Sequence, residues 1–367
     1  MSKKILFISN HAGFSKFNAP YMEDLHKQGN IVDNASPGIE TGYYDQHFDV
    51  PISRSPLAFS NILSLLKLIK ICRKERYDLI HCHTPVGGVI GRLLKIFFAK
   101  TKVIYTAHGF HFFKGAKWYT WLIYFPIEYV LSYLTDCIVT INDEDYKYAK
   151  ESFKAGRVFK INGIGVNLSR FKPDENIYTD MRSTLNFTKN DFVIIYAAQM
   201  IERKNHRFLL EAFSKFSHLE SSKLILIGDG ILMSELKDFV SKKGIENHVK
   251  FTGYVTNVED YYKCSDLLVS ASKQEGFGLN LVEGLACGLK YLASDVRGHR
   301  DIHALSEQNY LFDLDDENDF LTKLETLYSS EKASSKISGL QNVSSAKKFE
   351  VKNSVDAMRS VYRIYLD

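Results

Sequence analysis

The sequence has few cysteines and no arrangement of them that suggests a site. Only five of its 367 residues are cysteine: Cys72, Cys82, Cys137, Cys264 and Cys287. Their number is odd, they are scattered, and no Cys-x-x-Cys pair occurs. This usage excludes a disulfide framework and a cysteine-based zinc site, and it indicates reduced thiols in a cytoplasmic protein.

Long apolar runs are also absent. No uninterrupted stretch reaches the roughly 18 apolar residues expected of a membrane-spanning helix. The apolar run that begins at Ile5 stops at Ser9, which is too short for the core of a signal peptide. We therefore expect a cytoplasmic protein without a transmembrane helix.

The sequence has only a small excess of charge of one sign. The net charge is only +4, with 25% charged and 45% hydrophobic residues, so the chain is expected to be globular and charge gives no argument for nucleic acid as a partner. The charge is uneven, because residues 1–165 carry an excess of Lys and Arg and the remainder a slight excess of Asp and Glu.

Short apolar runs alternate with amphipathic segments in two successive series. In the first half we expect strands at 5–9, 79–83, 102–107, 136–141 and 158–161, and helices at 20–28, 61–76, 87–98 and 144–153. In the second half we expect strands at 192–198, 223–227, 249–252, 267–270 and 291–294, and helices at 205–216, 231–243, 258–263 and from about 279. Such alternation predicts two Rossmann-like α/β domains, each a doubly wound parallel sheet.

Three segments of the chain are expected to have different roles. Residues 1–165 would form the N-terminal, acceptor-binding domain, and residues 166–346 the C-terminal, nucleotide-sugar-binding domain. Residues 166–188 are predicted to be an irregular linker, and residues 347–367 an amphipathic helix that packs back toward the N-terminal domain. Parallel sheets bind ligands beyond the carboxyl ends of their strands, so we expect a central cleft that both domains face.

The segment Ser270–Gly288 carries the strongest chemical signal. A predicted strand ends near Ser270, Gly276 and Gly278 loosen the turn, and a helix follows. A helix N-terminus offers backbone N–H groups and a positive dipole end to an anion such as a diphosphate. Glu275 precedes this helix and Glu283 lies inside it; a carboxylate can accept hydrogen bonds from both hydroxyls of a ribose. Two ordinary surface glutamates are the alternative.

The frame Glu275-Gly-Phe-Gly-x-x-x-x-Glu283 resembles the paired-glutamate motif of retaining glycosyltransferases of family 4, which have the two-domain GT-B fold. Other segments are similar to that family: 166–171 to its linker motif, Lys204-Asn-His206 to its phosphate-binding lysine, and 253–255 to its base-proximal loop. Segments 81–88 and 106–115 resemble the branch that builds bacterial capsule and exopolysaccharide repeat units.

The resemblance implies an activity and a site. The enzyme would move a hexose or N-acetylhexosamine from a UDP-sugar to a polyprenyl-diphosphate-linked glycan, with retained configuration and with no cofactor or metal. Its catalytic residues would be His108, over the donor sugar, and Glu275, near the sugar 3- and 4-hydroxyls. Glu283 would hold the ribose, Lys204 and Arg203 the diphosphate. The remaining nucleotide-sugar contacts would be Gly13, Tyr254, Phe277, Gly278, Leu279, Asn280 and Leu281.

Some positions fit less well or remain open. The family often has Gly-Arg after the first strand of the second domain, where this chain has Ala198-Gln199, and Arg203 would have to supply the missing charge. No Asp-x-Asp metal motif in an apolar strand context is present; residues 143–145 come closest and are expected at a helix N-terminus. His81 and His83 could hold a metal, but the wall of a substrate pocket is the favoured interpretation.

Aromatic and basic residues in the first half suggest a membrane partner. Trp118, Tyr119, Trp121 and Tyr124 lie near Lys114 and Lys117, and segments 61–76 and 92–102 mix apolar with basic residues. Aromatic side chains favour membrane interfaces and basic clusters attract anionic lipid. The N-terminal domain would dock on the inner face of the cell membrane; the alternative is that the aromatics are core and the lysines solvated.

Three other functions are alternatives for this sequence. A GT-B-fold UDP-sugar epimerase would need neither acceptor nor membrane. A non-catalytic, membrane-bound scaffold of polysaccharide assembly would not need Glu275, Glu283, Lys204 and His108 together. A dinucleotide-binding dehydrogenase requires Gly-x-Gly-x-x-Gly, and residues 228–233 lack its third glycine.

Overall fold

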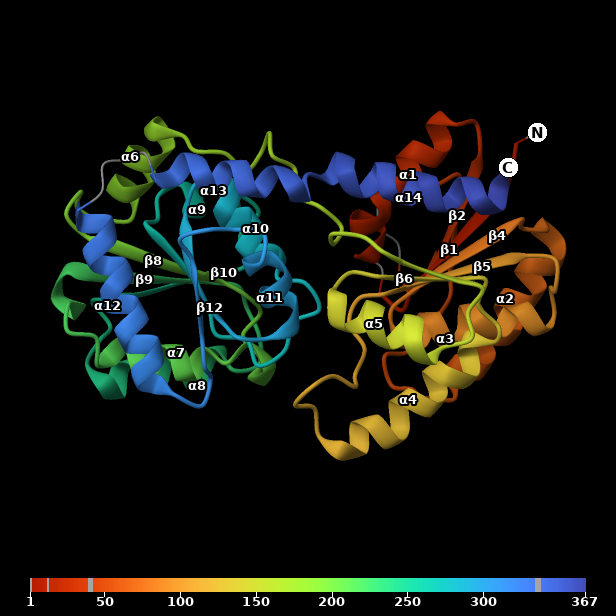
Figure 1. The fold of residues 1–367 in the computed structure, drawn as a ribbon, viewed down its shortest axis with the longest axis horizontal. Coiled ribbons are helices and arrows are strands. Elements are labelled where there is room, and N and C mark those ends of the chain that lie inside the picture. Colours follow the sequence, from red (N-terminus) through yellow and green to blue (C-terminus); the bar gives the residue numbers. More distant parts are fainter. Residues whose placement is uncertain (1, 12, 39–41, 334–337) are drawn as a thin grey trace. The chain divides into compact units, whose positions relative to one another are not determined.

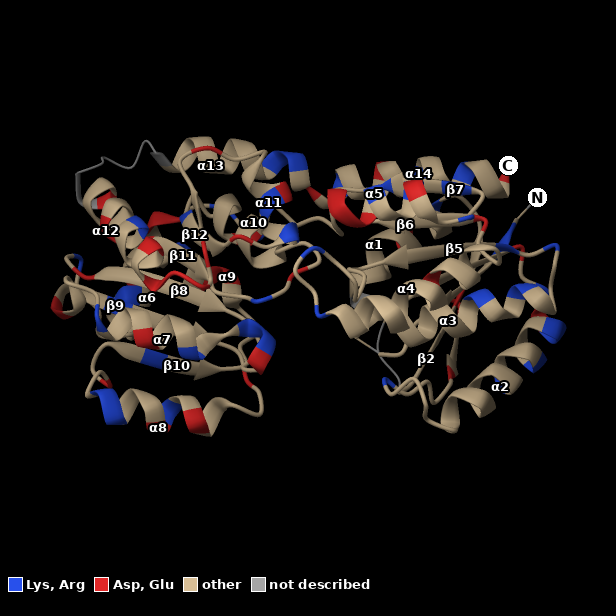
Figure 2. Cartoon of the chain, turned by 60° about the horizontal axis from the view of Figure 1, so that its bottom comes forward, with Lys and Arg blue, Asp and Glu red and all other residues tan. Residues whose placement is uncertain are grey.

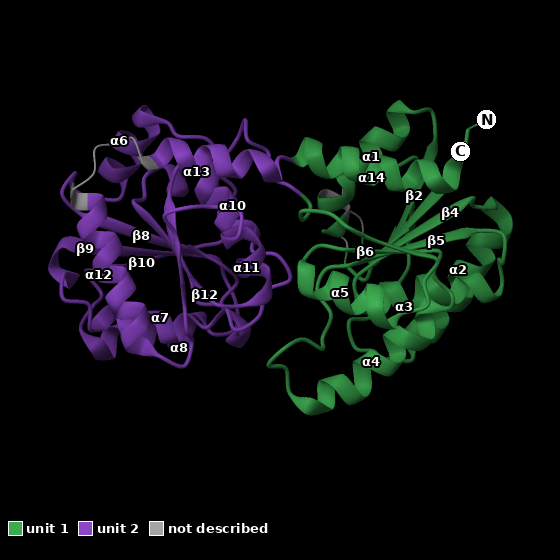
Figure 3. Ribbon diagram, in the orientation of Figure 1, with its two compact units in different colours: residues 1–164, 351–367 green, residues 165–350 purple. Residues whose placement is uncertain are grey.

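The computed structural model describes residues 2–11, 13–38, 42–333 and 338–367 (Figure 1). The chain forms two compact units, one of Met1–Ile164 with Val351–Asp367 and the other of Gly165–Glu350 (Figure 3). Each unit is an α/β structure with its own sheet, and each is described by itself below.

The sheet of the first unit has the strand order β3-β2-β1-β4-β5-β6-β7 among the described residues. All of these ladders are parallel. The strands are β1 Lys4–Ile8, β2 Ile31–Ser36, β3 Gln46–Asp49, β4 Leu79–His83, β5 Lys102–Ala107, β6 Cys137–Thr140 and β7 Arg157–Lys160.

Helices cover both faces of this sheet (Figure 1). They are α1 Phe14–Lys27, α2 Ser60–Glu75, α3 Pro85–Leu93, α4 Trp118–Ser132, α5 Asp143–Ser152 and α14 Val351–Leu366, with the 3-10 turn η1 Leu94–Ile96. The core under α2, α3, α4 and α5 contains Leu6, Ile8, Leu68, Cys82 and Phe112, all buried. Because both faces are covered, every residue of β4 is buried, histidines included.

The second unit repeats the design with the strand order β10-β9-β8-β11-β12-β13 in the part that the structure describes. Its ladders are parallel as well. The strands are β8 Phe192–Ala197, β9 Ser222–Ile227, β10 Val249–Gly253, β11 Leu267–Ser270, β12 Lys290–Ser294 and β13 Tyr310–Phe312.

The helices of the second unit also lie on both faces of its sheet. They are α6 Glu175–Thr184, α7 His206–Ser214, α8 Met233–Lys243, α9 Val258–Lys263, α10 Leu279–Ala286, α11 Arg297–His303, α12 Glu317–Ala333 and α13 Ser338–Ala346. The 3-10 turns are η2 Glu202–Lys204, η3 Leu219–Ser221 and η4 Lys347–Phe349. A core of Leu209, Phe213, Leu236, Phe320 and their neighbours packs against the strands.

The predicted fold class is confirmed: two doubly wound, all-parallel sheets. Both sheets reverse their strand order at one place, between β1 and β4 and between β8 and β11. Ligands of such sheets bind beyond the carboxyl ends of the strands at this switch point. The loops after β1, β4, β8 and β11 are therefore where functional side chains are expected.

Several local predictions were wrong. Strands β2 and β3 and helix α4 were not predicted, and α1 begins at Phe14 rather than at Pro20. Residues 166–188 are not irregular throughout, because they contain α6. Asp174 caps that helix by accepting from the backbone N–H groups of Asn176 and Ile177, a signal that its mixed-charge surroundings obscured.

Candidate active site

The loop after β8 is fastened to the loop after β11. The hydroxyl of Tyr196, in β8, donates to the backbone oxygen of Lys204 at 2.8 Å and lies 2.9 Å from the hydroxyl of Ser272. The backbone N–H of Lys273 donates to the oxygen of Arg203 at 2.8 Å. These bonds place η2 beside the residues that precede α10, on the two sides of the switch point.

Lys204 and Glu275 meet at this junction. The Lys204 ammonium pairs with the Glu275 carboxylate and donates a hydrogen bond to Oε1. The Arg203 guanidinium donates to the oxygen of Gln274 at 2.7 Å and lies 3.5 Å from Glu275 Oε2. The structure thus brings three of the predicted residues together, although Glu275 lies 72 positions after Arg203 and 71 positions after Lys204 in the chain.

Glu275 is held in its charged form. Its exposure is only 8%, and burial by itself would raise the pKa of the carboxyl. Attraction to Lys204, His299 and Arg203 outweighs this effect, so the pKa of Glu275 lies below its ordinary value. A buried carboxylate beside two cations can both accept hydrogen bonds from a polar substrate and orient the cations.

Gly278 allows the turn into α10. Its φ is +94°, a left-handed conformation, and a Cβ there would lie 2.8 Å from Cδ2 of His299. Leu279 begins the helix. The backbone N–H of Leu281 donates to the oxygen of Gly278 at 3.0 Å, so a diphosphate at this N–H would compete with that bond. Phe277 is buried and its ring lies 5.7 Å from that of Phe349.

Helix α11 supports this loop, a feature that the sequence analysis missed. A Cβ on Gly298 would lie 2.6 Å from the backbone N of Phe277, so the two backbones touch. Arg297 Nε donates to the oxygen of Glu275 at 3.4 Å, and His299 Nδ1 lies 2.8 Å from the oxygen of Ser294. The Arg-Gly-His sequence two residues after the end of β12 was the available signal.

Glu283 lies in a different electrostatic environment. Burial raises the pKa of this carboxyl to about 7, despite a 3.1 Å hydrogen bond from the Tyr262 hydroxyl and attraction to Arg170. Arg170 also pairs with Glu259 at 2.6 Å. Neither Tyr262 nor Arg170 was predicted, because they come from α9 and from the segment before α6. Glu283 can therefore change protonation near neutral pH.

Not every predicted residue joins this cluster. Tyr254, after β10, is 80% exposed, and Gln199, after β8, is exposed as well. The side chain of Asn280 lies within its own turn, where Oδ1 accepts from the N–H of Leu281 at 3.1 Å. The roles of Tyr254 and Asn280 at a nucleotide sugar remain predictions, whereas Gln199 is the position at which the chain departs from the family pattern.

In the first unit, His108 follows β5 and lies close to the loops after β1 and β4. His108 Nε2 is 3.1 Å from Nδ1 of His83, and its ring meets the ring of Phe14 edge-on at 4.9 Å. Gly13 precedes α1, and its N–H donates to His11 Nδ1 at 3.0 Å. Burial lowers the pKa of His108 to about 4, so this imidazole is neutral at physiological pH.

His81, one of the two β4 histidines that could hold a metal, is engaged by neighbouring side chains. Both ring nitrogens of His81 are engaged, Nδ1 with the hydroxyl of Tyr362 at 2.7 Å and Nε2 with that of Thr106 at 2.8 Å. Within the described residues no group of three or more His, Cys, Asp or Glu side chains is arranged to hold a metal ion.

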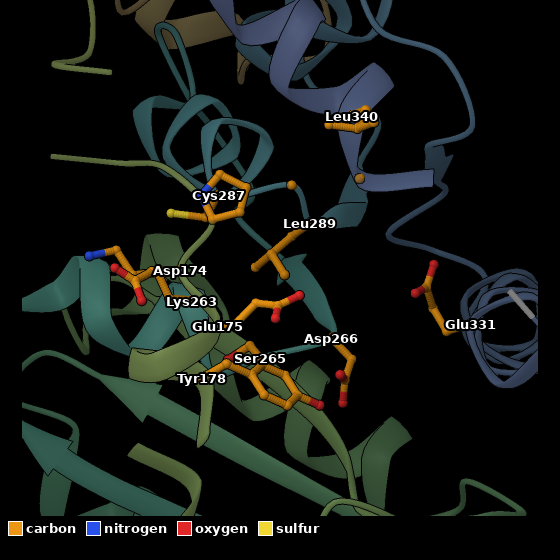
Figure 4. A pocket seen from close by; sticks show the side chains of 13 residues that line it. Asp174, Glu175, Tyr178, Lys263, Ser265, Asp266, Cys287, Leu289, Glu331 and Leu340 are labelled. Atoms are coloured by element: carbon orange, nitrogen blue, oxygen red, sulfur yellow. The ribbon is translucent and has the colours of Figure 1, made fainter. Parts of the chain in front are cut away.

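A separate pocket of about 360 Å³ lies elsewhere in the second unit (Figure 4). Acidic residues contribute to its wall: Asp174, Glu175, Asp266 and Glu331. Asp266 pairs with Arg182 at 2.6 Å and Glu331 with Lys290 at 2.8 Å, so these two carboxylates are already neutralised. None of the predicted site residues lines this pocket.

Comparison with known proteins assigns the chain to a family. Residues 178–339 match the family described as glycosyl transferases group 1, and residues 4–142 match the family described as glycosyl transferase 4-like. The chain is 37% identical over its whole length to EpsD, a candidate glycosyltransferase of Bacillus subtilis, and covers 98% of that protein. The chain belongs to the group 1 glycosyltransferase family.

Other relatives of this glycosyltransferase are more distant. It is 26% identical to an Escherichia coli enzyme named UDP-Gal:alpha-D-GlcNAc-diphosphoundecaprenol alpha-1,3-galactosyltransferase, over 77% of this chain and 76% of that one. Solved structures share its GT-B fold. HepE of Anabaena, in complex with UDP and glucose, has a TM-score of 0.81 at 16% identity and covers 98% of this chain and 99% of its own. Sucrose-phosphate synthase of Thermosynechococcus elongatus has a TM-score of 0.83 at 19% identity, with 99% of each chain covered.

Family membership also decides between the functions that the sequence left open. The protein is a transferase enzyme. The interpretations as a non-catalytic scaffold and as a dehydrogenase are therefore both wrong.

Proposed function

We propose that this glycosyltransferase moves a hexose or N-acetylhexosamine from a UDP-sugar to a polyprenyl-diphosphate-linked glycan acceptor, in the synthesis of capsule or exopolysaccharide. The observation that carries the proposal is the pairing of Lys204 with the buried carboxylate of Glu275, with Glu283 about one turn inside α10. Two relatives support the donor and acceptor classes, since one was solved with UDP and another is named for a diphosphoundecaprenol acceptor.

Each charged group has a distinct task in this proposal. Lys204 and Arg203 stabilise the negative charge that grows on the departing diphosphate, where fixed cations contribute most. Glu283, once ionised, accepts hydrogen bonds from the ribose hydroxyls. Glu275 accepts from the donor-sugar hydroxyls, and its pairing with Lys204 keeps it ionised for that purpose. His108 hydrogen-bonds the sugar.

Retention of configuration and independence from metal belong to the same proposal and rest on the resemblance to family 4. Proton NMR of the anomeric position in the product tests the first, and transfer in the presence of EDTA tests the second. An inverted product, or loss of activity that Mg²⁺ or Mn²⁺ restores, would refute the respective part.

A calorimetric screen against UDP-, GDP- and ADP-sugars tests the donor. We expect one UDP-sugar to bind, and Glu283→Ala to weaken its binding at least tenfold. A matched control is Glu235→Ala, because Glu235 lies exposed in α8 and pairs only loosely with Arg207 at 3.5 Å. Incubation with the UDP-sugar alone, without acceptor, should leave the sugar unchanged; an epimerised product would contradict transfer as the function.

We further propose that the first unit docks on the inner face of the cell membrane, through α2 and α4. The aromatic residues between Phe110 and Tyr133 are partly buried and partly exposed. Phe110 and Phe112 are core, and Trp121, Tyr124 and Phe125 pack against it. Other apolar residues of α4 and its end are exposed to solvent: Trp118, Tyr119, Leu122, Ile123, Ile127, Val130 and Tyr133.

Charge on α2 favours an anionic lipid surface over another apolar partner. Leu57, Phe59, Ile62, Leu63 and Leu66 are exposed at and before the start of the helix. Lys67, Lys70, Arg73 and Lys74 are exposed along it. Figure 2 shows blue segments on α2 and an α4 that is almost wholly tan. An apolar groove of about 370 Å³ opens between the α2 and α3 residues Ile62, Leu65, Val86, Val89 and Ile90. No helix of the described residues is long and apolar enough to span a bilayer.

Liposome sedimentation tests the docking. We expect binding to vesicles that contain phosphatidylglycerol, weakened by salt, by the α4 double variant Trp118→Ser/Leu122→Ser and by Lys70→Glu/Arg73→Glu. Ile231→Ser is the matched control, because Ile231 is an 87% exposed apolar residue of the second unit. Equal sedimentation of all variants, or no dependence on anionic lipid, would refute docking.

A further inference from the structure

Three histidines of adjacent strands come together in the first unit. His81 and His83 lie on the same face of β4, with ring centroids 4.1 Å apart. His108 follows β5, and its ring centroid lies 5.4 Å from that of His83. His81 is fully bonded to Tyr362 and Thr106, as described above, and so forms a fixed support behind the His83 ring.

The imidazole of His83 has one hydrogen-bonding partner among the described residues. Its Nδ1 lies 3.1 Å from Nε2 of His108. The side chain is 1% exposed, and its other nitrogen, Nε2, is a buried atom without a partner among the described residues. Phe7 stacks on one side of the ring at 5.9 Å, and Phe14 lies 5.8 Å away. The position of this imidazole is therefore set by packing, and its one polar bond is directed at His108.

Both rings are neutral, so the contact has a direction. Burial lowers the pKa of His83 well below its ordinary value and that of His108 to about 4. If His108 donated from Nε2, the single proton of His83 would lie on its buried, unpartnered Nε2. Orphaned buried N–H groups are rarer in proteins than under-satisfied acceptors. The favoured arrangement has His83 Nδ1–H donating to His108 Nε2.

We propose that His83 is a positioning residue that fixes the tautomer of His108. Because His108 Nε2 accepts this bond, the proton of His108 stays on Nδ1. That nitrogen has no protein partner in the described part of the chain and is the one left to donate a hydrogen bond to a hydroxyl of the donor sugar. The inference rests on the proposed role of His108 at that sugar. Phe14, edge-on to the His108 ring, limits its rotation.

Nitrogen NMR on the full chain labelled at histidine tests the proposal directly. We expect the Nδ1–H tautomer for His108 in the unsubstituted protein, with its signals assigned through His108→Ala. In His83→Phe, which keeps the ring volume but not the donor, His108 should become a mixture of tautomers. In His83→Asn, whose amide N–H can take the place of Nδ1–H, the Nδ1–H tautomer should persist.

Kinetics give a second readout that a merely structural role would not change. For His83→Phe we expect kcat to fall on the order of tenfold with little change in KM, because a fraction of the His108 rings would then carry the proton on Nε2 and could not donate from Nδ1. His83→Asn should restore kcat. His81→Phe removes a buried histidine from the same strand; it should lower Tm without changing the His108 tautomer.

Two outcomes would overturn the inference: a proton on Nε2 of His108 in the unsubstituted protein, or the same His108 tautomer in His83→Phe as without the substitution. Full transfer activity in His108→Ala would instead refute the proposed role of His108, whatever the tautomer. The two failures are therefore distinguishable.

Discussion

At the scale of single residues, Lys204 and Glu275 depend on each other. Glu275 is nearly inaccessible, and a buried carboxylate without a partner would take up a proton. Lys204 prevents this and is at the same time the cation proposed to meet the diphosphate. Removing it therefore alters two groups at once.

We expect Lys204→Ala to lower the transfer rate on the order of 100-fold, because it removes a cation from the leaving group and weakens the ionisation of Glu275. Steady-state kinetics with the UDP-sugar and a lipid-linked acceptor measure the effect. Lys243→Ala serves as control, since Lys243 pairs with Glu211 on the surface. A Lys204→Ala rate within twofold of the unsubstituted rate would contradict this role.

The raised pKa of Glu283 predicts that nucleotide affinity depends on pH. Its pKa is raised by burial to about 7 from an ordinary 4.5, so the carboxylate that a ribose requires is formed only as the pH passes 7. We expect nucleotide affinity to increase between about pH 6 and pH 8. Calorimetry across this range measures the increase, and Glu283→Gln should abolish it. An affinity that is flat in the unsubstituted protein would show that Glu283 does not hold the ribose as a carboxylate.

The same shift affects stability with a defined sign. The folded-state pKa lies above the unfolded value, so Glu283 stabilises the fold below about pH 4.5, and this contribution is lost as the pH rises through 7. Glu283→Gln should therefore raise Tm at pH 8, and the gain should shrink toward pH 5. Differential scanning calorimetry at both values tests this. A lower Tm at pH 8 would contradict the sign.

At the scale of elements, α11 holds the loop that carries Glu275. Glycine in a helix is ordinarily less stable than alanine. At position 298 the order should reverse, because a Cβ would lie 2.6 Å from the backbone of Phe277. Neither backbone can yield as a flexible side chain could.

We expect Gly298→Ala to destabilise the protein by roughly 1–3 kcal/mol and to weaken nucleotide binding, since the loop from Glu275 to Gly278 must shift. Denaturant unfolding and calorimetry give the two values. Gly339→Ala is the matched control: Gly339 is also helical, and its nearest neighbour would lie at an ordinary 3.4 Å. Equal effects of the two substitutions would contradict the close-packing argument.

At the scale of the whole molecule, the C-terminal helix α14 belongs to the first unit. Arg359 pairs with Asp24 of α1, Ser354 bonds Tyr21 at 2.6 Å, and Met358 is fully buried. The first unit therefore includes α14 in its packing, whereas the second unit is formed by the single segment Gly165–Glu350.

We expect Met358→Ala to destabilise the first unit by about 2–5 kcal/mol through the cavity that it leaves. Hydrogen exchange should show faster exchange in β1, β2 and β4, with protection in β8 and β11 unchanged. Ile364→Ala, at a half-exposed position of the same helix, should have little effect. Uniform loss of protection in both units would contradict the independence of the second.

The central strands were predictable because a parallel strand covered on both faces is apolar throughout. The predicted bounds of the strands at 79–83 and 267–270 match β4 and β11. The sequence did not reveal β2 and β3, where Asp33, Asn34 and His47 interrupt the apolar pattern. The buried Asp33 carboxylate is satisfied by the Tyr77 hydroxyl at 2.5 Å, a bond across 44 positions that no local pattern announces.

The sequence by itself determined the fold class, the family, and which loops carry the paired glutamates, the lysine and the histidines, because strand periodicity and motif spacing are local properties. Only the tertiary structure decided what each group does there. Glu275 and Glu283 have the same intrinsic acidity, but their pKa values shift in opposite directions. The pKa of Glu275 is lowered because Lys204 pairs with it, and the pKa of Glu283 is raised because burial dominates there. Lys204 and His299 lower the pKa of Glu275, whereas Tyr262 and Arg170 only moderate the effect of burial on Glu283. These partners are brought in by different elements, and only folding brings them within reach.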